Sequence, residues 1–124
     1  MKKELLELAL DQINFEFESS YLYLSMSAWA QENGYPGTAK WMEKQAEEEI
    51  SHGKKMMHFL QEVNERVVLT PIAAGPVDFP GFMEIFKLSL EHEKKVTARI
   101  VRLYEEATAA KEYALANLYS WFIN

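Results

Sequence analysis

The sequence contains no cysteine among its 124 residues. Disulfide bonds, iron–sulfur clusters, thiolate zinc sites and a thiol nucleophile are therefore excluded, so any metal site has to use oxygen and imidazole ligands. Glycine (5) and proline (4) are too scarce for a collagen-like or disordered chain. Because hydrophobic side chains make up 48% of the sequence, we expect residues 1–124 to form a single domain around one core.

Positive charge and long apolar runs are also scarce. The chain has 13 Lys and Arg against 19 Asp and Glu, a net charge of −6, whereas nucleic-acid binding requires clustered basic side chains. No apolar run approaches the roughly 18 residues of a membrane span, and acidic residues interrupt the N-terminal "MKKELLELALDQ", unlike a signal peptide. We therefore expect a cytoplasmic protein with no nucleic-acid or membrane partner and an attraction for cations.

Apolar and small residues recur at three- and four-residue steps, which predicts an all-α chain. The predicted helices cover 4–33, the stretch from the turn at 35–37 to 64, and 81–110, with a fourth from 112. The segment "NERVVLTPIAAGPVDFP" (64–80) holds three of the four prolines and is too long for a tight turn. This pattern predicts a four-helix bundle with a long crossover between the second and third helices. The fourth helix has about three turns before Asn124, so we expect it to be incomplete.

The same spacing predicts which side chains point into the bundle. The first helix is expected to turn Leu5, Leu8, Ile13, Glu16 and Tyr23 inward. The predicted inward stripes of the later helices are Trp41, Gln45, Glu49, His52, Met56, Phe59 and Val63; Phe82, Phe86, Ser89, Glu93, Val96, Ile100, Leu103 and Ala107; and Ala114, Leu118, Trp121 and Phe122.

Each long helix thus places a carboxylate on its inward stripe. Glu16, Glu49 and Glu93 each lie 12 residues beyond the predicted start of their helix, about 18 Å along it, so they can meet at one level. Burying several unpaired carboxylates would cost several kcal/mol each, and no Lys or Arg, Arg99 included, falls on the stripes. A metal is the remaining counter-charge. Glu49 and His52 form a Glu-x-x-His pair, which together with lone Glu residues on other helices is typical of di-iron carboxylate bundles, with iron or manganese as the metal.

Simpler readings compete with this one. Glu47 is expected on a solvated face, Glu48 is open between solvent and site, and Glu18 points away from Glu16 on the same helix. A single inward histidine is more often a hydrogen-bonded core residue than a ligand, and Tyr23 suits either the core or a place beside the metal. The remaining candidates are expected to be structural or exposed: Trp121 packs, and His58 and His92 face solvent.

Three stretches carry a family resemblance. "NFEFESSYLYLSMSAW", "AEEEISH" and "EHEKKVTARI" resemble the bacterial non-haem ferritins, and the similarity extends over the whole chain. By that resemblance the ferroxidase-centre ligands are Glu16, Glu49, His52 and Glu93, with Glu49 bridging two irons. Tyr23 resembles the tyrosine beside the centre, and Glu48 a residue that helps to hold a third iron.

The resemblance also implies a function and an assembly. Ferritins oxidise Fe²⁺ with O₂ or H₂O₂ and store the ferric mineral inside a homo-oligomeric shell of 24 subunits. Their fourth helix continues beyond the position of Asn124 with a further Glu or Gln pair, and a fifth helix follows, so we expect a C-terminally incomplete ferritin-like domain. The alternatives are a non-catalytic helical assembly protein and a fragment with a disabled centre. A haem-bearing bacterioferritin stays open, whereas a rubrerythrin-like peroxidase would need cysteine.

Overall fold

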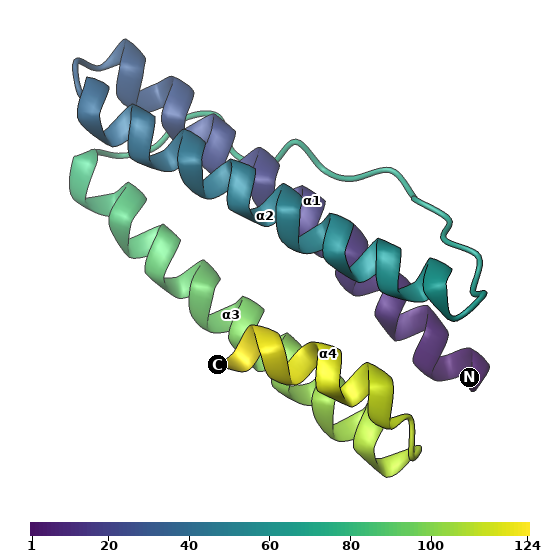
Figure 1. The fold of residues 1–124 in the computed structure, drawn as a ribbon. Helices are drawn as coiled ribbons and strands as arrows, with labels where there is room; N and C mark the ends of the chain where they lie inside the picture. Colours follow the sequence, from purple (N-terminus) through teal and green to yellow (C-terminus); the bar gives the residue numbers. More distant parts are fainter.

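The computed structural model describes residues 1–124 and contains four helices and no strand: α1 (Lys3–Glu32), α2 (Pro36–Glu62), α3 (Phe82–Ala109) and α4 (Tyr113–Ile123). α1 and α2 form a long antiparallel pair, α3 runs beside them, and α4 turns back along the end of α3 (Figure 1). The predicted all-α class is confirmed, and each helix begins and ends within two residues of its expected position.

A short turn joins α1 to α2. Gly34 has φ of +87°, a left-handed conformation that glycine adopts at little cost, and the Tyr35 backbone N–H donates to the carbonyl of Ala30 at 2.8 Å. α2 then begins at Pro36, earlier than expected, because proline fits the first helical position, where its missing N–H is not needed. The tight turn fixes α1 and α2 as direct neighbours.

The crossover between α2 and α3 runs along the outside of α1 (Figure 1). Asn14 on α1 donates to the Thr70 hydroxyl at 2.6 Å, and the Ser25 hydroxyl donates to the carbonyl of Pro76, also at 2.6 Å. These two bonds attach an irregular segment to a helix along several turns. The crossover therefore brings the chain to the far end of the bundle, as its length predicted.

The apolar core consists of two clusters. One lies toward the N-terminal end of α1 and the C-terminal ends of α2 and α3, where Ile13, Leu60 and Ile100 pack with Tyr119 of α4. The other lies at the opposite end, around Tyr23, Met26, Met42 and Ile85. Four buried polar residues of α1 begin beside the last α1 residues of the first cluster and end before the second cluster begins. These are Gln12, Glu16, Ser19 and Ser20.

The inward stripe of α2 differs from its prediction. Trp41 and Val63 are 44% and 42% exposed, and only Glu49 and Met56 of the expected stripe are buried. The buried set alternates small and large residues: Ala39, Met42, Ala46, Glu49, Gly53, Met56 and Leu60. The small residues are explained by the close approach of α1, since a Cβ on Gly53 would lie 2.9 Å from the Phe17 ring. The size of the apolar side chains therefore did not predict which face of α2 is buried.

The buried face of α4 overlaps the expected one only in part: Leu118 and Phe122 pack against the first cluster, as predicted. Leu115, Ala116 and Tyr119 are buried, whereas Ala114 is exposed and Trp121 is 56% exposed. The prediction that Trp121 packs in the core is therefore wrong; its ring instead lies 3.9 Å from the Lys55 ammonium, a cation–π contact at the surface. The α3 stripe is confirmed from Ser89 to Ala107, except that Ile85 is buried at its start and Phe82, Phe86 and Glu93 are half-buried.

None of the four helices combines the length and the apolar character that crossing a membrane requires.

The packing predicts a matched pair of stability effects. Leu60 is 1% exposed in the first cluster, whereas Leu90 on α3 is 58% exposed. Leu60→Ala should lower the free energy of unfolding by about 2–5 kcal/mol, because the substitution leaves a cavity. Leu90→Ala should change it by less than about 0.5 kcal/mol. Urea unfolding followed by circular dichroism measures both, and equal losses would contradict this description of the core.

Candidate metal centre

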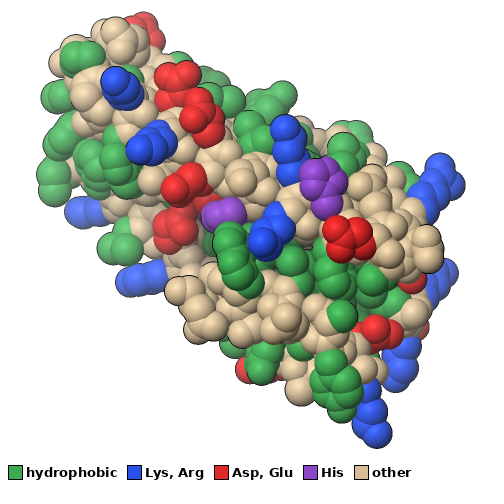
Figure 2. Space-filling model, in the orientation of Figure 1, with side chains coloured by type: hydrophobic (Ala, Val, Ile, Leu, Met, Phe, Trp, Pro, Cys, Tyr) green, Lys and Arg blue, Asp and Glu red, His purple; other side chains and the backbone are tan.

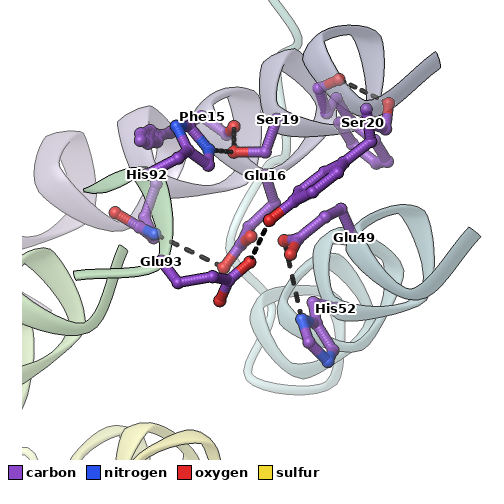
Figure 3. A network of polar contacts seen from close by, with 11 residues as sticks. Phe15, Glu16, Ser19, Ser20, Glu49, His52, His92 and Glu93 are labelled. Carbon is purple, nitrogen blue, oxygen red and sulfur yellow. Dashed lines mark hydrogen bonds and ion pairs between the residues drawn. The ribbon is translucent and has the colours of Figure 1, made fainter. Parts of the chain in front are cut away.

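Side chains from two helices meet in the polar layer between the clusters. Glu16 reaches inward from α1, and Glu49 and His52 reach inward from successive turns of α2. One ligand atom from each of the three lies within 4.8 Å of the others, and the carboxylates of Glu16 and Glu49 face each other (Figure 3). The Glu16 and Glu49 side chains are 0% and 3% exposed, and His52 is half-buried. His52 Nδ1 lies 3.7 Å from Glu49 Oε2.

A third helix adds a carboxylate and a phenol. The half-buried Glu93 of α3 points toward Glu16 and Glu49 (Figure 3). The Tyr23 hydroxyl donates to Glu93 Oε1 at 2.5 Å and lies 3.3 Å from the Ser89 hydroxyl. Tyr23 is completely buried. Four predicted site residues on three helices thus face one layer of the bundle, with Tyr23 against the Glu93 carboxylate.

Two carboxylate oxygens in this layer have no hydrogen-bond partner. They are Glu16 Oε2 and Glu49 Oε2, and both are inaccessible to solvent. Leaving such a buried acceptor unsatisfied costs free energy, more for a charged group than for a neutral one. Oxygen ligands beside an imidazole suit iron or manganese. The residues present therefore fit a divalent metal ion, which would coordinate both free oxygens.

The electrostatics of the layer are those of crowded acids. Burial, followed by the neighbouring Glu49, raises the pKa of Glu16 to about 9. Burial opposes ionisation of Glu49 as well, but its interactions with His52 and Glu16 are stronger and lower its pKa. The same contact with Glu49 raises the pKa of His52. Burial raises the pKa of Glu93 and of Tyr23. At neutral pH Glu16 is therefore protonated while Glu49 is ionised.

His92 does not face solvent as predicted. It is half-buried, its Nε2 lies 2.7 Å from the Ser19 hydroxyl, and its ring stacks on Phe15 with the centroids 5.3 Å apart. Burial lowers its pKa. Its position follows from α3 packing beside α1, so that the residue next to Glu93 meets α1 instead of water. His58 and Glu47 are exposed, as expected.

Sequence reasoning missed two residues beside the site. Gln12 is buried next to Glu16, and Arg99 donates to Gln12 across the α1–α3 contact. Arg99 is thus partly buried and hydrogen-bonded toward the site, although all basic residues were expected to lie away from it. The i, i+4 spacing of Gln12 and Glu16 was a readable signal, whereas the contribution of Arg99 required the relative placement of two helices.

Glu48 and Glu18 lie outside this group. Both side chains are exposed, and neither belongs to the three residues that could share one ion. On the surface formed by α2, acidic side chains lie next to a histidine (Figure 2). The role of Glu48 in holding a third iron stays a prediction.

The fold and the site together define a class: a helical bundle with a buried carboxylate–histidine group suited to a hard metal ion. Comparisons narrow it further. The family model described as a ferritin-like domain matches residues 6–124. A bacterial non-heme ferritin of Staphylococcus epidermidis is 36% identical over 124 residues, which are 100% of this chain and 75% of that protein. A "probable bacterial non-heme ferritin-like protein" of Haemophilus influenzae is 34% identical over 99% of this chain and 74% of its own length.

The structural comparison agrees. The open-pore ferritin of Archaeoglobus fulgidus superposes with a TM-score of 0.97 at 35% identity, covering 99% of this chain and 76% of that one. The chain belongs to the ferritin family of iron-storage proteins.

The acidic layer predicts a pH-dependent stability of the metal-free protein. Because the pKa of Glu16 rises on folding from 4.5 to about 9, its contribution is complete below pH 4.5 and is lost as the pH approaches 9. The Tm measured in EDTA should therefore fall between pH 5 and 9. Glu16→Gln keeps a neutral side chain at every pH, so the decrease of its Tm between pH 5 and 9 should be smaller than that of wild type. Glu47→Gln, on the exposed face of α2, should show the same decrease as wild type. If the Tm of Glu16→Gln depended on pH as that of wild type does, the pH dependence could not be assigned to Glu16.

Proposed function

We propose that this chain binds two Fe²⁺ ions as substrate at the Glu16–Glu49–His52–Glu93 centre and oxidises them to Fe³⁺ with O₂ or H₂O₂. The ferric product is then stored inside a homo-oligomeric shell. The observation that carries the proposal is the pair of buried oxygens on Glu16 and Glu49 that accept no hydrogen bond and lie beside His52. Family membership supports iron as the metal.

Each ligand has a role that its position supports. The Glu49 carboxylate faces the carboxyl groups of Glu16 and Glu93 in the same layer (Figure 3), so its two oxygens suit a bridge between two ions. Glu16 and His52 serve the first ion, and Glu93 serves the second. Tyr23, hydrogen-bonded to Glu93, orients that carboxylate and places a phenol beside the centre.

The chemistry follows from the ligand set. Carboxylate oxygens stabilise Fe³⁺ more than Fe²⁺, which lowers the cost of losing an electron. Two Fe²⁺ ions give two electrons; with two protons these convert O₂ to H₂O₂, or H₂O₂ to two molecules of water. Binding requires ionised carboxylates, so Glu16 has to lose its proton when the metal arrives. A centre that holds two Fe²⁺ ions can thus supply both of the electrons that one oxidant molecule accepts.

The exterior supports delivery and assembly. A net charge of −6 favours the approach of Fe²⁺, and the exposed Glu48 beside Glu49 is the candidate for a third iron site. Large apolar side chains on α1 and the crossover remain exposed, with Tyr21 at 48% and Leu69 at 54%, which suits contacts between subunits. A shell of 24 copies, a cytoplasmic location and a single domain over residues 1–124 stay predictions. Sedimentation velocity measures the assembly.

A ferrous titration tests the centre. Under anaerobic conditions the wild-type assembly should bind about two Fe²⁺ per chain, and admission of O₂ should produce the ferric absorbance faster than in buffer alone. Glu49→Gln and His52→Ala should lower the oxidation rate at least tenfold, since ligand loss disrupts the shared site. Glu47→Gln on the exposed face of the same helix is the matched control.

The competing reading is a helical assembly protein without a working centre. Under that reading Glu49→Leu should raise the Tm by removing a buried charge, and Fe²⁺ should leave the Tm of wild type and variant unchanged. Under our proposal Fe²⁺ raises the Tm of the wild type and not that of Glu49→Leu. Absence of an iron-dependent rise in the wild type would eliminate the ferroxidase proposal.

A further inference from the structure

A buried amide lies between the centre and the surface. Gln12, on α1 one turn before Glu16, is only 1% exposed. Its Nε2 donates to Glu16 Oε1 at 3.4 Å, and its Oε1 accepts a hydrogen bond from Arg99 Nε of α3 at 2.9 Å. These contacts form a continuous line of hydrogen bonds from α3 to a predicted metal ligand.

Arg99 fixes which way the amide points. A guanidinium group has donors and no acceptor, so only the carbonyl oxygen of Gln12 can face it. The NH₂ group must then face Glu16. Arg99 itself is held on two further sides: its NH2 group donates to the Asp11 carboxylate at 2.8 Å, and its guanidinium carbon lies 4.0 Å from the centre of the Phe15 ring. The orientation of Gln12 is thus set from outside the metal layer.

This arrangement distinguishes the two oxygens of Glu16. Oε1 accepts from Gln12, whereas Oε2 is buried and has no hydrogen-bond partner. The line of contacts thus leaves one defined oxygen of Glu16 available beside Glu49 and His52.

We propose that Gln12 and Arg99 are positioning residues that hold Glu16 so that it binds the metal through Oε2. The proposal rests on the metal centre described above and adds residues that do not touch the metal.

The neutral amide also solves an electrostatic problem. A positive side chain directly beside Glu16 would repel an incoming cation, and a second carboxyl there would join the crowded acids. Gln12 lets Arg99 orient the ligand from one residue away, and Asp11 offsets the charge of Arg99 at the surface. An amide is therefore better suited to this position than either kind of charged side chain.

Substitutions in the 124-residue protein test the proposal. Gln12→Leu has a similar volume and removes both hydrogen bonds, and Gln12→Asn keeps an amide that is one methylene too short. Arg99→Met keeps an unbranched stem and removes the donors, whereas Arg99→Lys retains a charged donor. Arg102→Met is the matched control, because Arg102 is exposed on the same helix, so the substitution removes the same charge and leaves the Arg99–Gln12 bond. Circular dichroism checks that each variant is folded.

The readout is anaerobic Co²⁺ binding, followed by its visible absorption spectrum, together with the Fe²⁺ oxidation rate. Both Gln12 variants and Arg99→Met should bind Co²⁺ about 10–100-fold more weakly, the usual effect of losing a ligand's supporting hydrogen bond, and should change the spectrum. The KM for Fe²⁺ should rise more than kcat falls. Arg99→Lys should restore part of the loss, and Arg102→Met should stay within about twofold of wild type.

The outcomes separate this inference from the proposed function. If wild type binds neither Co²⁺ nor Fe²⁺, the proposed function fails and this inference fails with it. If wild type binds and folded Gln12→Leu, Gln12→Asn and Arg99→Met keep its affinity and spectrum, the positioning role is refuted while the centre stands. A change that Arg102→Met reproduces in full would assign the effect to surface charge and would also refute the role.

Discussion

The burial of the Glu16 and Glu49 carboxyl groups side by side is the constraint on which the rest of the structure depends. Two carboxylates cannot both ionise there without a counter-charge, and each has one oxygen that accepts no hydrogen bond. The two apolar clusters on either side hold the helices together around this layer. The bundle is therefore stabilised by apolar packing toward both ends of the helices. The free energy gained there offsets the cost of burying carboxyl groups in the layer between the clusters. Because the apolar clusters occupy the two ends, the buried polar residues lie near the middle of α1 and α2.

The close α1–α2 contact is what turns this constraint into a defined geometry. Ala39, Ala46 and Gly53 lie at seven-residue steps along the buried side of α2, and the ring of Phe17 occupies the space that a Cβ on Gly53 would need. Small residues let two helices approach closely, so the side chains of Glu16 and Glu49 can share one ion. These small residues add little apolar surface to the core. They nevertheless bring α2 close enough to α1 for side chains of both helices to face the same site.

Helix positions and the inward carboxylates could be predicted from the sequence, because both follow from helical spacing. Glu16, Glu49 and His52 lie together as their spacing requires, and the crossover has the length that places α3 beside them. The orientation of α2 and α4 could not be predicted in the same way. Trp41 and Trp121 looked like core residues by size, yet the separation of the helices decides burial, and single-helix periodicity does not contain that separation. His92 and Arg99 were misplaced for a related reason: their partners, Ser19 and Gln12, are on another helix.

The residues that spacing alone could not place are also those that surround the ligands. A ligand on an inward stripe can be read from one helix, but its orientation depends on hydrogen bonds that cross between helices, as from Tyr23 to Glu93 and from Arg99 to Gln12. In each case a group on a neighbouring helix occupies one carboxylate oxygen or fixes the amide that does so. α1 and α3 thus restrict one another through polar contacts, whereas α1 and α2 do so through close apolar packing. The bundle consequently supplies both the low-dielectric layer that makes unpaired carboxylates attract a cation and the directional contacts that determine which of their oxygens face it.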